Sequence, residues 1–431
     1  MDSIWTKTTE LPRFAPLDGE LHTDALIIGG GMAGVLCAHG LARAGIDYAL
    51  VEADRIGSGI TKNTTAKITS QHGLIYDKLI REFDAETAKL YLQANLEALE
   101  RFRELFRGID CDFEEKDSFV YSRNDRRKIE REAAALARLG FPATVETELP
   151  LPFPIAGAVR FPGQAQFHPL KFLRAIAQGL RIFEHTKVLE LMPGKAVTTG
   201  GAISAKKIII ATHFPILNKH GGYFMKLYQQ RSYVLALEGA PDVGGMYVDE
   251  REGGLSFRNC QGLLLLGGGS HRTGKPGGWK DLENFARKNY PQARIAAKWA
   301  TQDCMSLDGV PYIGRYAKNT PGLYVSTGFN KWGMTSSMVS AILLTDLVLG
   351  RKNTYTPVFR PSRRILRPQL AANAWESVVS LLTPTVPRCP HMGCALKCNA
   401  AEHSWDCPCH GSRFSEDGAL IDNPATDDKK I

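Results

Sequence analysis

Two short boxes of cysteine and histidine near the end of the chain constrain its fold more than any other feature. The first box, Cys-Pro-His-Met-Gly-Cys, begins at Cys389, and the second, Cys-Pro-Cys-His-Gly-Ser, begins at Cys407. Each box offers one thiol and one imidazole at close spacing, Cys389 with His391 and Cys407 with His410. These four side chains are the candidate metal ligands, in a stretch that holds five of the nine cysteines of the chain.

Two kinds of metal centre use this ligand set. Two thiolates on one iron and two imidazoles on the other make a Rieske-type [2Fe-2S] centre, and the same ligands make the N2S2 tetrahedron of a structural zinc site. A zinc site does not require the two remaining cysteines of the boxes, Cys394 and Cys409. It also does not need Gly393 and Gly411, where the backbone can approach bridging sulfides, or the Ser412 hydroxyl, which can donate to one of them. These neighbours favour the cluster.

The segment resembles the high-potential Rieske proteins, and the resemblance implies a disulfide between Cys394 and Cys409. It departs from them at Phe414, where the Rieske pattern often has a tyrosine. Hydrogen bonds to sulfur favour the reduced, more negative cluster, so we expect the missing phenol to lower the reduction potential. Cys398 lies between the boxes and has no assigned role.

A glycine-rich turn near the start of the chain forms a second signature. The apolar run 23–28 leads into Gly-Gly-Gly-Met-Ala-Gly and then a helix-like stretch, which is a strand, a turn and a helix. Gly29 permits the tight turn, Gly31 lets the backbone approach a pyrophosphate, and Gly34 allows close packing of the helix. A second strand ends at Glu52, whose carboxylate can accept from ribose hydroxyls. The pattern predicts a dinucleotide site.

Segments 308–314 and 322–335, with the apolar stretch that follows, look like the closing elements of the D-amino-acid-oxidase-like (DAO) flavoenzyme superfamily. The resemblance implies that the dinucleotide is FAD, and that a helix N-terminus reaches the flavin ring. No Cys or His occurs in 328–335, so covalent attachment at that turn is excluded, while His72 remains a candidate attachment point.

The motif and the resemblance together place FAD contacts in the glycine-rich turn, the acid after the second strand, the polar loop 57–67, two later strands and the closing turn. The loop can donate to phosphate oxygens, or it is an ordinary polar surface loop. The predicted cofactor residues are Gly29, Gly31, Gly34, Glu52, Ala53, Gly59, Thr61, Thr64, Thr65, Val188, Ala211, Thr212, Gly328, Gly333, Met334 and Thr335.

The strand-like pattern of 230–266 predicts an antiparallel sheet over the flavin face, where relatives place their substrate pockets. The sequence names no catalytic residue. Polar and aromatic candidates to line a substrate pocket are Arg231, Tyr233, Tyr247, Arg258, Lys331 and Trp332.

A chain of 431 residues exceeds one ordinary core. We expect an α/β fold with an α+β substrate domain: a Rossmann-like FAD-binding domain with an inserted antiparallel-sheet domain, then a small all-β segment. The predicted units are a DAO-like domain over 1–360 (nucleotide-binding parts about 20–75, 155–215 and 300–350; substrate parts about 76–154 and 216–299), a helical linker over 361–383 and a minimal Rieske domain over 384–431.

Helical periodicity predicts helices within 77–108, 126–140 and 369–382. The most membrane-like stretch, 336–350, is too short to span a bilayer and is predicted to be a buried helix. The first 22 residues carry no apolar core of a signal peptide, so we expect a cytoplasmic protein. The four remaining cysteines are expected to be apolar core thiols: Cys37, Cys111, Cys260 and Cys304.

The connector 351–367 is rich in proline and holds five arginines. We expect a solvated linker; the alternative is that its charge, with the net charge of +8, attracts an acidic electron partner or an anionic surface. No nucleic-acid partner is expected, because no reading motif accompanies the basic residues. The roughly fifty residues that follow are too few for a core of their own, so we expect them to pack on the flavoprotein part.

A two-electron carrier and a one-electron carrier in one chain predict an oxidoreductase that depends on FAD and a [2Fe-2S] cluster. By family analogy, we expect dehydrogenation of an amine or amino-acid-like substrate, with electrons leaving through the cluster to a protein or quinone. The alternatives are a reductase fed through the cluster by a ferredoxin-like partner, and a non-catalytic redox sensor or electron-transfer protein. A Rieske oxygenase is disfavoured, because the sequence offers no convincing set of two histidines and one carboxylate for a mononuclear iron.

Overall fold

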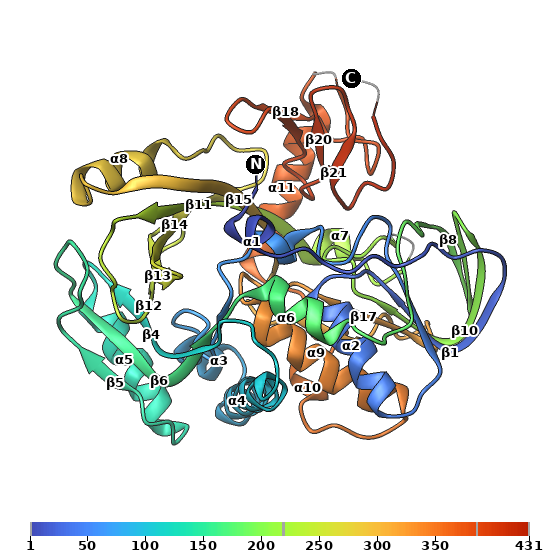
Figure 1. Cartoon of the computed structure of the whole chain (residues 1–431), viewed down its shortest axis with the longest axis horizontal. Helices are drawn as coiled ribbons and strands as arrows, with labels where there is room; N and C mark the ends of the chain where they lie inside the picture. The colour runs from blue at the N-terminus through green and yellow to red at the C-terminus, as the bar shows by residue number, and fades with distance from the viewer. Residues whose placement is uncertain (1, 218–219, 385–386, 430–431) are drawn as a thin grey trace.

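Three β-sheets and the helices packed on them make up the computed structural model, which describes residues 2–217, 220–384 and 387–429 (Figure 1). The first sheet, at the right of Figure 1, has eight strands, the second, at the left, has nine, and a four-stranded sheet lies at the top. This arrangement confirms the predicted fold class.

The first sheet is built around the predicted strand before the glycine-rich turn. β1 pairs in parallel with β2 and β10, so that Ile28 lies between Val51 and Ile210. The carboxyl ends of these strands therefore meet at one edge. The order is β16-β17-β10-β1-β2-β7, with β9 on β10 and β8 on β9, over β1 (Leu21–Ile28), β2 (Tyr48–Val51), β7 (Ile182–Phe183), β8 (Val188–Met192), β9 (Lys195–Thr198), β10 (Gly201–Ile210), β16 (Tyr312–Arg315) and β17 (Leu323–Thr327).

The second sheet draws its strands from two stretches, residues 67–166 and 227–306. Most neighbours are antiparallel, as expected, but β12 and β4 run parallel. β3 and β6 fall in ranges predicted for nucleotide binding and pair here instead. The order is β15-β11-β14-β13-β12-β4-β6-β3 with β5 on β6, over β3 (Lys67–Ile68), β4 (Glu114–Ser122), β5 (Thr144–Glu146), β6 (Gly157–Gln166), β11 (Leu227–Glu238), β12 (Met246–Asp249), β13 (Ser256–Cys260), β14 (Leu263–Arg272) and β15 (Arg294–Ser306).

The helices pack on these sheets and on one another. α2 (Met32–Arg43), which follows the glycine-rich turn, packs against the predicted buried helix α9 (Gly333–Val348). α4 (Ala85–Phe106), which also packs on α9, begins where the Asp84 carboxylate accepts from the Thr87 N–H at 2.6 Å. The others are α1 (Ile4–Thr8), η1 (Ile60–Asn63), α3 (Tyr76–Glu82), α5 (Arg126–Arg138), α6 (Pro169–Ile176), α7 (Tyr223–Lys226), α8 (Lys280–Asn289), α10 (Thr356–Phe359) and α11 (Pro368–Leu382).

The third sheet belongs to the C-terminal segment, a name used here for residues 387–429. It is an antiparallel meander of β18 (Lys397–Asn399), β19 (Ser404–Asp406), β20 (Arg413–Ser415) and β21 (Leu420–Asp422). Its own apolar core is small and consists mainly of the box cysteines with Leu396, Phe414 and Ala425. Most of what orders the segment must therefore come from contacts with the larger sheets and from the metal ligation that the two boxes predict.

The connector before this segment is not the solvated linker that its composition predicts. The Arg363 side chain is buried, and its guanidinium pairs with the Asp308 carboxylate through Nε–Oδ2 at 2.6 Å and Nη2–Oδ1 at 2.8 Å. The same group also donates to the Pro311 carbonyl and lies over the Tyr312 ring. Because a buried guanidinium needs such partners, the connector is fixed to the first sheet at this point.

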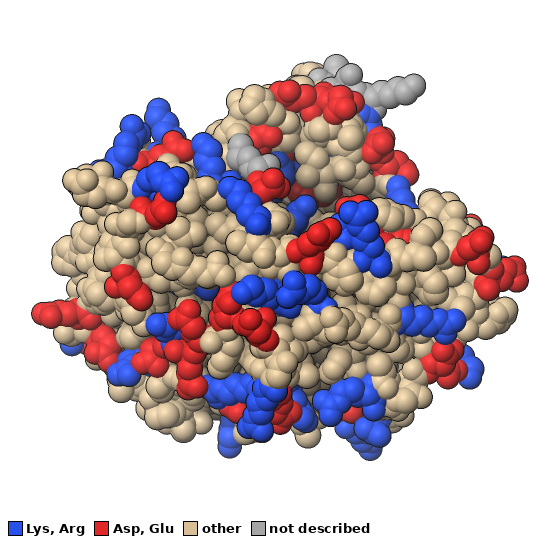
Figure 2. Space-filling model, in the orientation of Figure 1, with Lys and Arg blue, Asp and Glu red and all other residues tan. Residues whose placement is uncertain are grey.

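Cys37, Cys111, Cys260 and Cys304 are buried free thiols, as expected, and Cys398 is an exposed one. On the face seen in Figure 2, acidic and basic side chains are interspersed. Among the described residues, no helix has the length and apolar character needed to cross a bilayer.

Candidate functional site

A cavity of about 450 Å³ opens between the first two sheets, at the carboxyl edge of β1 and the N-terminus of α2. The structure brings eight of the sixteen predicted FAD residues to its wall. These are Gly31, Thr61, Thr64, Thr65, Ala211, Gly328, Gly333 and Met334.

The three glycines of the turn are needed for different structural reasons. A Cβ on Gly29, which has φ +110°, would lie 2.6 Å from the Ala211 carbonyl oxygen, and a Cβ on Gly34 would lie 1.9 Å from the Gly29 carbonyl oxygen. Packing within the protein therefore requires both. A Cβ on Gly31 would meet only the Thr61 hydroxyl, at 3.5 Å, in a place that opens to the cavity. The space above Gly31 is thus left for a ligand at the helix N-terminus, which fits a pyrophosphate.

The other eight predicted contacts do not line this cavity, and their role toward FAD stays a prediction. Glu52 holds the turn itself, because its carboxylate accepts from the Gly30 N–H at 2.6 Å and the Asp54 N–H at 3.0 Å. Burial raises the pKa of this carboxyl. The remaining seven are Gly29, Gly34, Ala53, Gly59, Val188, Thr212 and Thr335.

The wall of the cavity also carries three of the predicted pocket residues, Tyr233, Lys331 and Trp332. Asp303, which the sequence did not indicate, joins them on the wall. Burial raises the pKa of Asp303 to about 6 against the opposing effect of the Lys331 charge. Burial likewise lowers the pKa of Lys331, whose ammonium donates to the Ser270 hydroxyl. Asp303 and Lys331 therefore add an acid and a cation to a wall that also carries Lys67, Asp249, Glu250, Arg251 and Glu252.

Three predicted pocket residues lie elsewhere. The Tyr247 hydroxyl donates to the Val243 carbonyl, and Arg258 is buried with its guanidinium donating to the Thr65 and Ala66 carbonyls. Arg231 pairs with Glu402 of the C-terminal segment. Each of these three side chains contacts other protein groups and does not line the cavity.

His72 supports the turn that contains Trp332. Its Nδ1 shares a hydrogen with the Tyr91 hydroxyl at 2.6 Å, its Nε2 contacts the Thr69 carbonyl and the Thr335 hydroxyl, and its ring stacks on Trp332 at 5.1 Å. Burial lowers the pKa of His72 to about 3, so the ring is neutral. Both ring nitrogens are engaged by protein groups, which argues against covalent attachment of a flavin here.

The two cysteine and histidine boxes fold into matching loops. In the first, the Cys389 N–H donates to the Cys394 carbonyl at 2.8 Å; in the second, the Cys407 N–H donates to the Ser412 carbonyl at 2.8 Å. Each loop is closed by a glycine N–H that donates back to the first cysteine carbonyl at 2.9 Å, and these glycines, Gly393 and Gly411, have positive φ. Two equivalent loops face one centre.

The four predicted ligands lie together between these loops. The His391 and His410 rings are 4.9 Å apart and nearly perpendicular. The pKa of Cys389 is lowered, because the neighbouring Cys407 thiol donates a hydrogen bond to its sulfur and the Ser412 hydroxyl donates another. The buried Nδ1 of His410 has no hydrogen-bond partner among the described residues. Two adjacent sulfurs on one side and two imidazoles on the other suit a [2Fe-2S] cluster.

The predicted disulfide between Cys394 and Cys409 is present and joins the two loops, with Cα atoms 6.7 Å apart. The sulfurs of these two residues and of Cys407 lie within 4.8 Å of one another. A disulfide sulfur is not a thiolate ligand, so only Cys407 of this group can bind iron. The bridge therefore leaves Cys389 and Cys407 as the thiolates.

The imidazole side of the centre packs against the larger sheets. The Phe214 ring lies edge-on to both His391 and His410 at 6.4 Å, and Phe224 lies edge-on to His410 at 6.2 Å. His213, the neighbour of Phe214, lines the cavity. Asn423 fixes this stretch by donating to the carbonyls of Thr212 at 2.6 Å and Phe214 at 2.8 Å. One short segment after β10 therefore contacts both sites.

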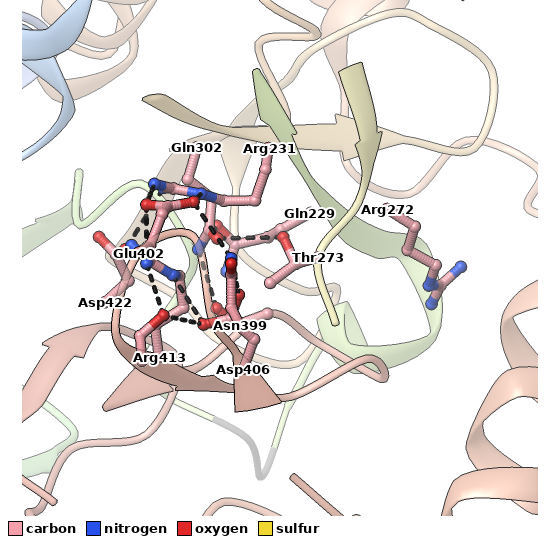
Figure 3. Close-up of polar contacts among 12 residues, drawn as sticks. Gln229, Arg231, Arg272, Thr273, Gln302, Asn399, Glu402, Asp406, Arg413 and Asp422 are labelled. Carbon is pink, nitrogen blue, oxygen red and sulfur yellow. Dashed lines mark hydrogen bonds and ion pairs between the residues drawn. The ribbon is translucent and has the colours of Figure 1, made fainter. Parts of the chain in front are cut away.

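Buried polar side chains of β11 and β15 clamp the second loop (Figure 3). The Gln229 amide donates to the His410 and Asn423 carbonyls, both at 2.9 Å. The Gln302 amide donates to the Gly411 carbonyl and to the Gln229 side-chain oxygen, both at 2.8 Å. Because buried carbonyls without donors are costly, these glutamines fix the loop to the second sheet.

A buried network of charges lies beside the clamp in Figure 3. Arg413 donates to the carboxylates of Glu402 at 2.9 Å, Asp406 at 2.9 Å and Asp422 at 3.0 Å, while Arg231 reaches Glu402 from β11. Burial alone would raise the pKa of Glu402, but the two arginines lower it. The expected packing of the small segment on the larger part is therefore made by charged and polar groups.

Several of these residues have no local signal in the sequence. Gln229 and His410 are 181 positions apart, and no motif marks either glutamine or Asp303 as functional. Phe214 could have been noticed, because it lies two residues after the predicted contact Thr212, in the turn after a strand. A strand end is where functional side chains collect in such sheets.

Comparisons with known proteins agree with both sites. The FAD dependent oxidoreductase family (DAO) matches residues 24–347, and the Rieske [2Fe-2S] domain matches residues 382–430. The chain is 33% identical to the Rieske 2Fe-2S iron-sulfur protein YhfW of Bacillus subtilis, over 98% of this chain and 96% of that one. It is 23% identical to the gamma-glutamylputrescine oxidoreductase of Escherichia coli, over 78% of this chain and 87% of that one.

A solved structure, glycine oxidase from Geobacillus kaustophilus, superposes with a TM-score of 0.67 at 22% identity, over 80% of this chain and all of that one. The open space above Gly31 at the N-terminus of α2 fits the pyrophosphate of FAD. The facing loops, with two sulfurs and two imidazoles, fit a Rieske cluster. The chain therefore belongs to the DAO family of FAD-dependent oxidoreductases and carries a C-terminal Rieske [2Fe-2S] domain.

Proposed function

We propose that the chain dehydrogenates an amine or amino-acid-like substrate in the cavity and passes the electrons from the flavin through the cluster to an external protein or quinone. The observation that carries the proposal is the segment after β10. His213 lines the cavity, and the adjacent Phe214 contacts both imidazole ligands of the cluster. Neighbouring Cα atoms lie about 3.8 Å apart, so the two sites share one stretch of backbone.

The cofactors define the chemistry and the protein defines the arrangement. When bound, FAD supplies hydride acceptance and the cluster supplies one-electron transfer. Thr61 orders the N-terminus of α2, because its hydroxyl accepts from the Met32 N–H at 3.0 Å. Gln229 and Gln302 hold the cluster loop against β11 and β15. These contacts keep the carriers in a fixed relation during turnover.

The cavity wall supports a substrate that carries an amino group. Lys331 presents a cation, which suits a substrate carboxylate, and Asp303 presents an acid, which suits a substrate ammonium. The relatives named as glycine oxidase and gamma-glutamylputrescine oxidoreductase carry names of amino compounds. Both observations favour an amine or amino acid over a simple alcohol.

An open cavity also bears on the non-catalytic alternative. A redox sensor without turnover would need no space beyond its cofactor, and side chains would fill the remainder. Here the cavity extends from Gly31 to Asp303 and to Glu252, which accepts from the Gln230 amide. FAD would fill part of this space, so the proposal predicts that room for a substrate remains beside Asp303 once FAD is bound, and a filled remainder would favour the sensor.

Anaerobic stopped-flow spectroscopy of the holoprotein tests the proposal. Glycine, proline and gamma-glutamylputrescine serve as first substrates, with absorbance followed at flavin and cluster wavelengths. Flavin bleaching that precedes cluster bleaching is expected. Cluster bleaching first, on addition of a reduced ferredoxin, would favour the reductase. A bleached flavin beside a cluster that stays oxidised would refute electron exit through the cluster.

A further inference from the structure

Helix α11 (Pro368–Leu382) is packed the opposite way from an ordinary surface helix. Its two buried side chains are polar, Asn373 and Ser380. All of its exposed residues are apolar, and Trp375 and Leu382 are 70% and 77% exposed. The exposed residues are Pro368, Ala371, Ala372, Ala374, Trp375, Val378, Val379, Leu381 and Leu382. A surface helix normally shows the reverse pattern.

Hydrogen bonds fix this orientation. The Asn373 side-chain oxygen accepts from Arg272 Nη1 at 2.8 Å, and Arg272 also donates to the Pro408 and Cys409 carbonyls. The Ser380 hydroxyl donates to the Ala395 carbonyl at 3.3 Å. Because the polar face is bound to both β14 and the C-terminal segment, the helix cannot roll to bury its apolar face.

The apolar surface continues onto the first ligand loop. The Arg388 guanidinium donates to the carbonyls of Leu381 at 3.3 Å and Gly393 at 2.8 Å. The Leu381 side chain lies 4.0 Å from the position of a Cβ on Gly393. Met392, beside Gly393, is 43% exposed. We call the whole surface the α11 face; it consists of Trp375, Val378, Val379, Leu381, Leu382 and Met392.

We propose that the α11 face binds the surface of a lipid bilayer that contains anionic lipids. Apart from the indole N–H of Trp375, its side chains offer no hydrogen-bonding group, which suits acyl chains. Cations stand at both ends of the helix, Arg364 before it and Arg388 after it, and neither forms an ion pair among the described residues. Aromatic and aliphatic side chains flanked by arginine make an interfacial membrane site.

The geometry favours a bilayer over other occupants. A helix of 15 residues is shorter than the roughly 20 that a span requires, so α11 would lie in the interface. Transient electron-transfer interfaces between proteins are small, and protein interfaces generally have polar rims and about one hydrogen bond per 100–200 Å². A face so poor in donors and acceptors matches the lipid phase better. Binding needs no turnover, so the inference stands apart from the proposed function.

Vesicle flotation of the full-length holoprotein tests this inference. We expect it to float with vesicles of phosphatidylcholine and phosphatidylglycerol in equal parts, and less with phosphatidylcholine alone. Trp375→Glu with Leu382→Glu should reduce the floating fraction at least tenfold, and Arg364→Gln should weaken binding to the anionic vesicles. The matched control is Leu189→Glu on β8, which removes a leucine that is 60% exposed in the first sheet.

Cofactor absorbance of each variant reports that the chain is still folded. Failure of the folded wild type to float would overturn the inference, as would an equal loss in the Leu189→Glu control. A second copy is the other occupant to distinguish, by sedimentation without lipid. A dimer that the double substitution turns into a monomer, with no flotation of either, would assign the α11 face to self-association and overturn the membrane site.

Discussion

Gln229→Ala should loosen the C-terminal segment from the larger sheets. The side chain is 1% exposed, and its amide is the donor to the buried carbonyl of His410 and to the partly buried carbonyl of Asn423. A buried acceptor that loses its donor costs about 1–3 kcal/mol. About 2 kcal/mol for the buried His410 carbonyl and about 1 kcal/mol for the partly buried Asn423 carbonyl give about 3 kcal/mol, or roughly a hundredfold change in the equilibrium between docked and undocked segment.

Hydrogen–deuterium exchange measures this opening directly. The N–H groups of Cys407 and Gly411 are bonded within the second loop, and peptides that contain them should exchange up to roughly a hundredfold faster in Gln229→Ala. Peptides of α2 should not change. In stopped flow, cluster reduction should slow while flavin reduction keeps its rate, because the substitution lies on the cluster side of the cavity.

Gln166→Ala is the matched control for this experiment. Gln166 is also 1% exposed, and its amide donates to the Asn259 carbonyl at 2.8 Å, within the second sheet and away from the C-terminal segment. It should destabilise the fold without faster exchange of the second loop alone. Unchanged exchange of that loop in a folded Gln229→Ala protein would refute the reasoning, since the clamp would then contribute nothing to docking.

The remaining predictions concern the cavity and the cluster. Burial raises the pKa of Asp303 to about 6, so its carboxylate is charged above that pH; KM for an amine should rise as pH falls below about 6. Asp303→Asn should raise KM roughly 10- to 100-fold at pH 8, from loss of a charge-assisted bond of about 1.5–3 kcal/mol, and remove this pH dependence. If KM of the Asp303→Asn variant still rises at low pH, Asp303 is not the group that binds the amine. Phe414→Tyr should raise the cluster potential, by about 40 mV if the new hydrogen bond strengthens by about 1 kcal/mol on reduction, as checked by redox titration; an unchanged or lower potential would contradict this. Cys394→Ser with Cys409→Ser opens a bridge of sequence separation 15, worth about 3 kcal/mol, and should speed cluster loss on warming, followed by absorbance; equal loss rates would show that the bridge is dispensable.

Features with local spacing could be predicted from the sequence. The meeting of the four predicted ligand side chains, the disulfide pair and the strand-turn-helix at Gly29–Gly34 each arise within a short stretch, where residue type and spacing express one geometric need. Helices within 77–108 and 126–140 were predicted on the same ground, and the structure has α3, α4 and α5 there. Local patterns are sufficient when one element or one loop creates the feature.

Features made by residues that are far apart in the sequence could not be predicted from it. Composition suggested that the arginines of the connector are solvated, but Arg363 is buried because Asp308 meets it 55 positions earlier in the chain. Arg231 was a candidate for the substrate pocket, and it pairs instead with Glu402, 171 positions later. In both cases a charged side chain is placed by a tertiary partner, and nothing in its own neighbourhood specifies that partner.

The two imidazole ligands lie in different surroundings, and this difference limits how an external partner can approach. His410 is 4% exposed and lies against Phe214 and Phe224, so a partner in solution or in a membrane cannot reach its ring. His391 is partly exposed and precedes the exposed Met392. An external partner that meets a cluster ligand must therefore meet His391, on the side where the apolar surface of α11 begins. The inner contact does not separate the two ligands, because Phe214, the neighbour of the cavity residue His213, lies 6.4 Å from both rings, so only the outer approach distinguishes His391 from His410.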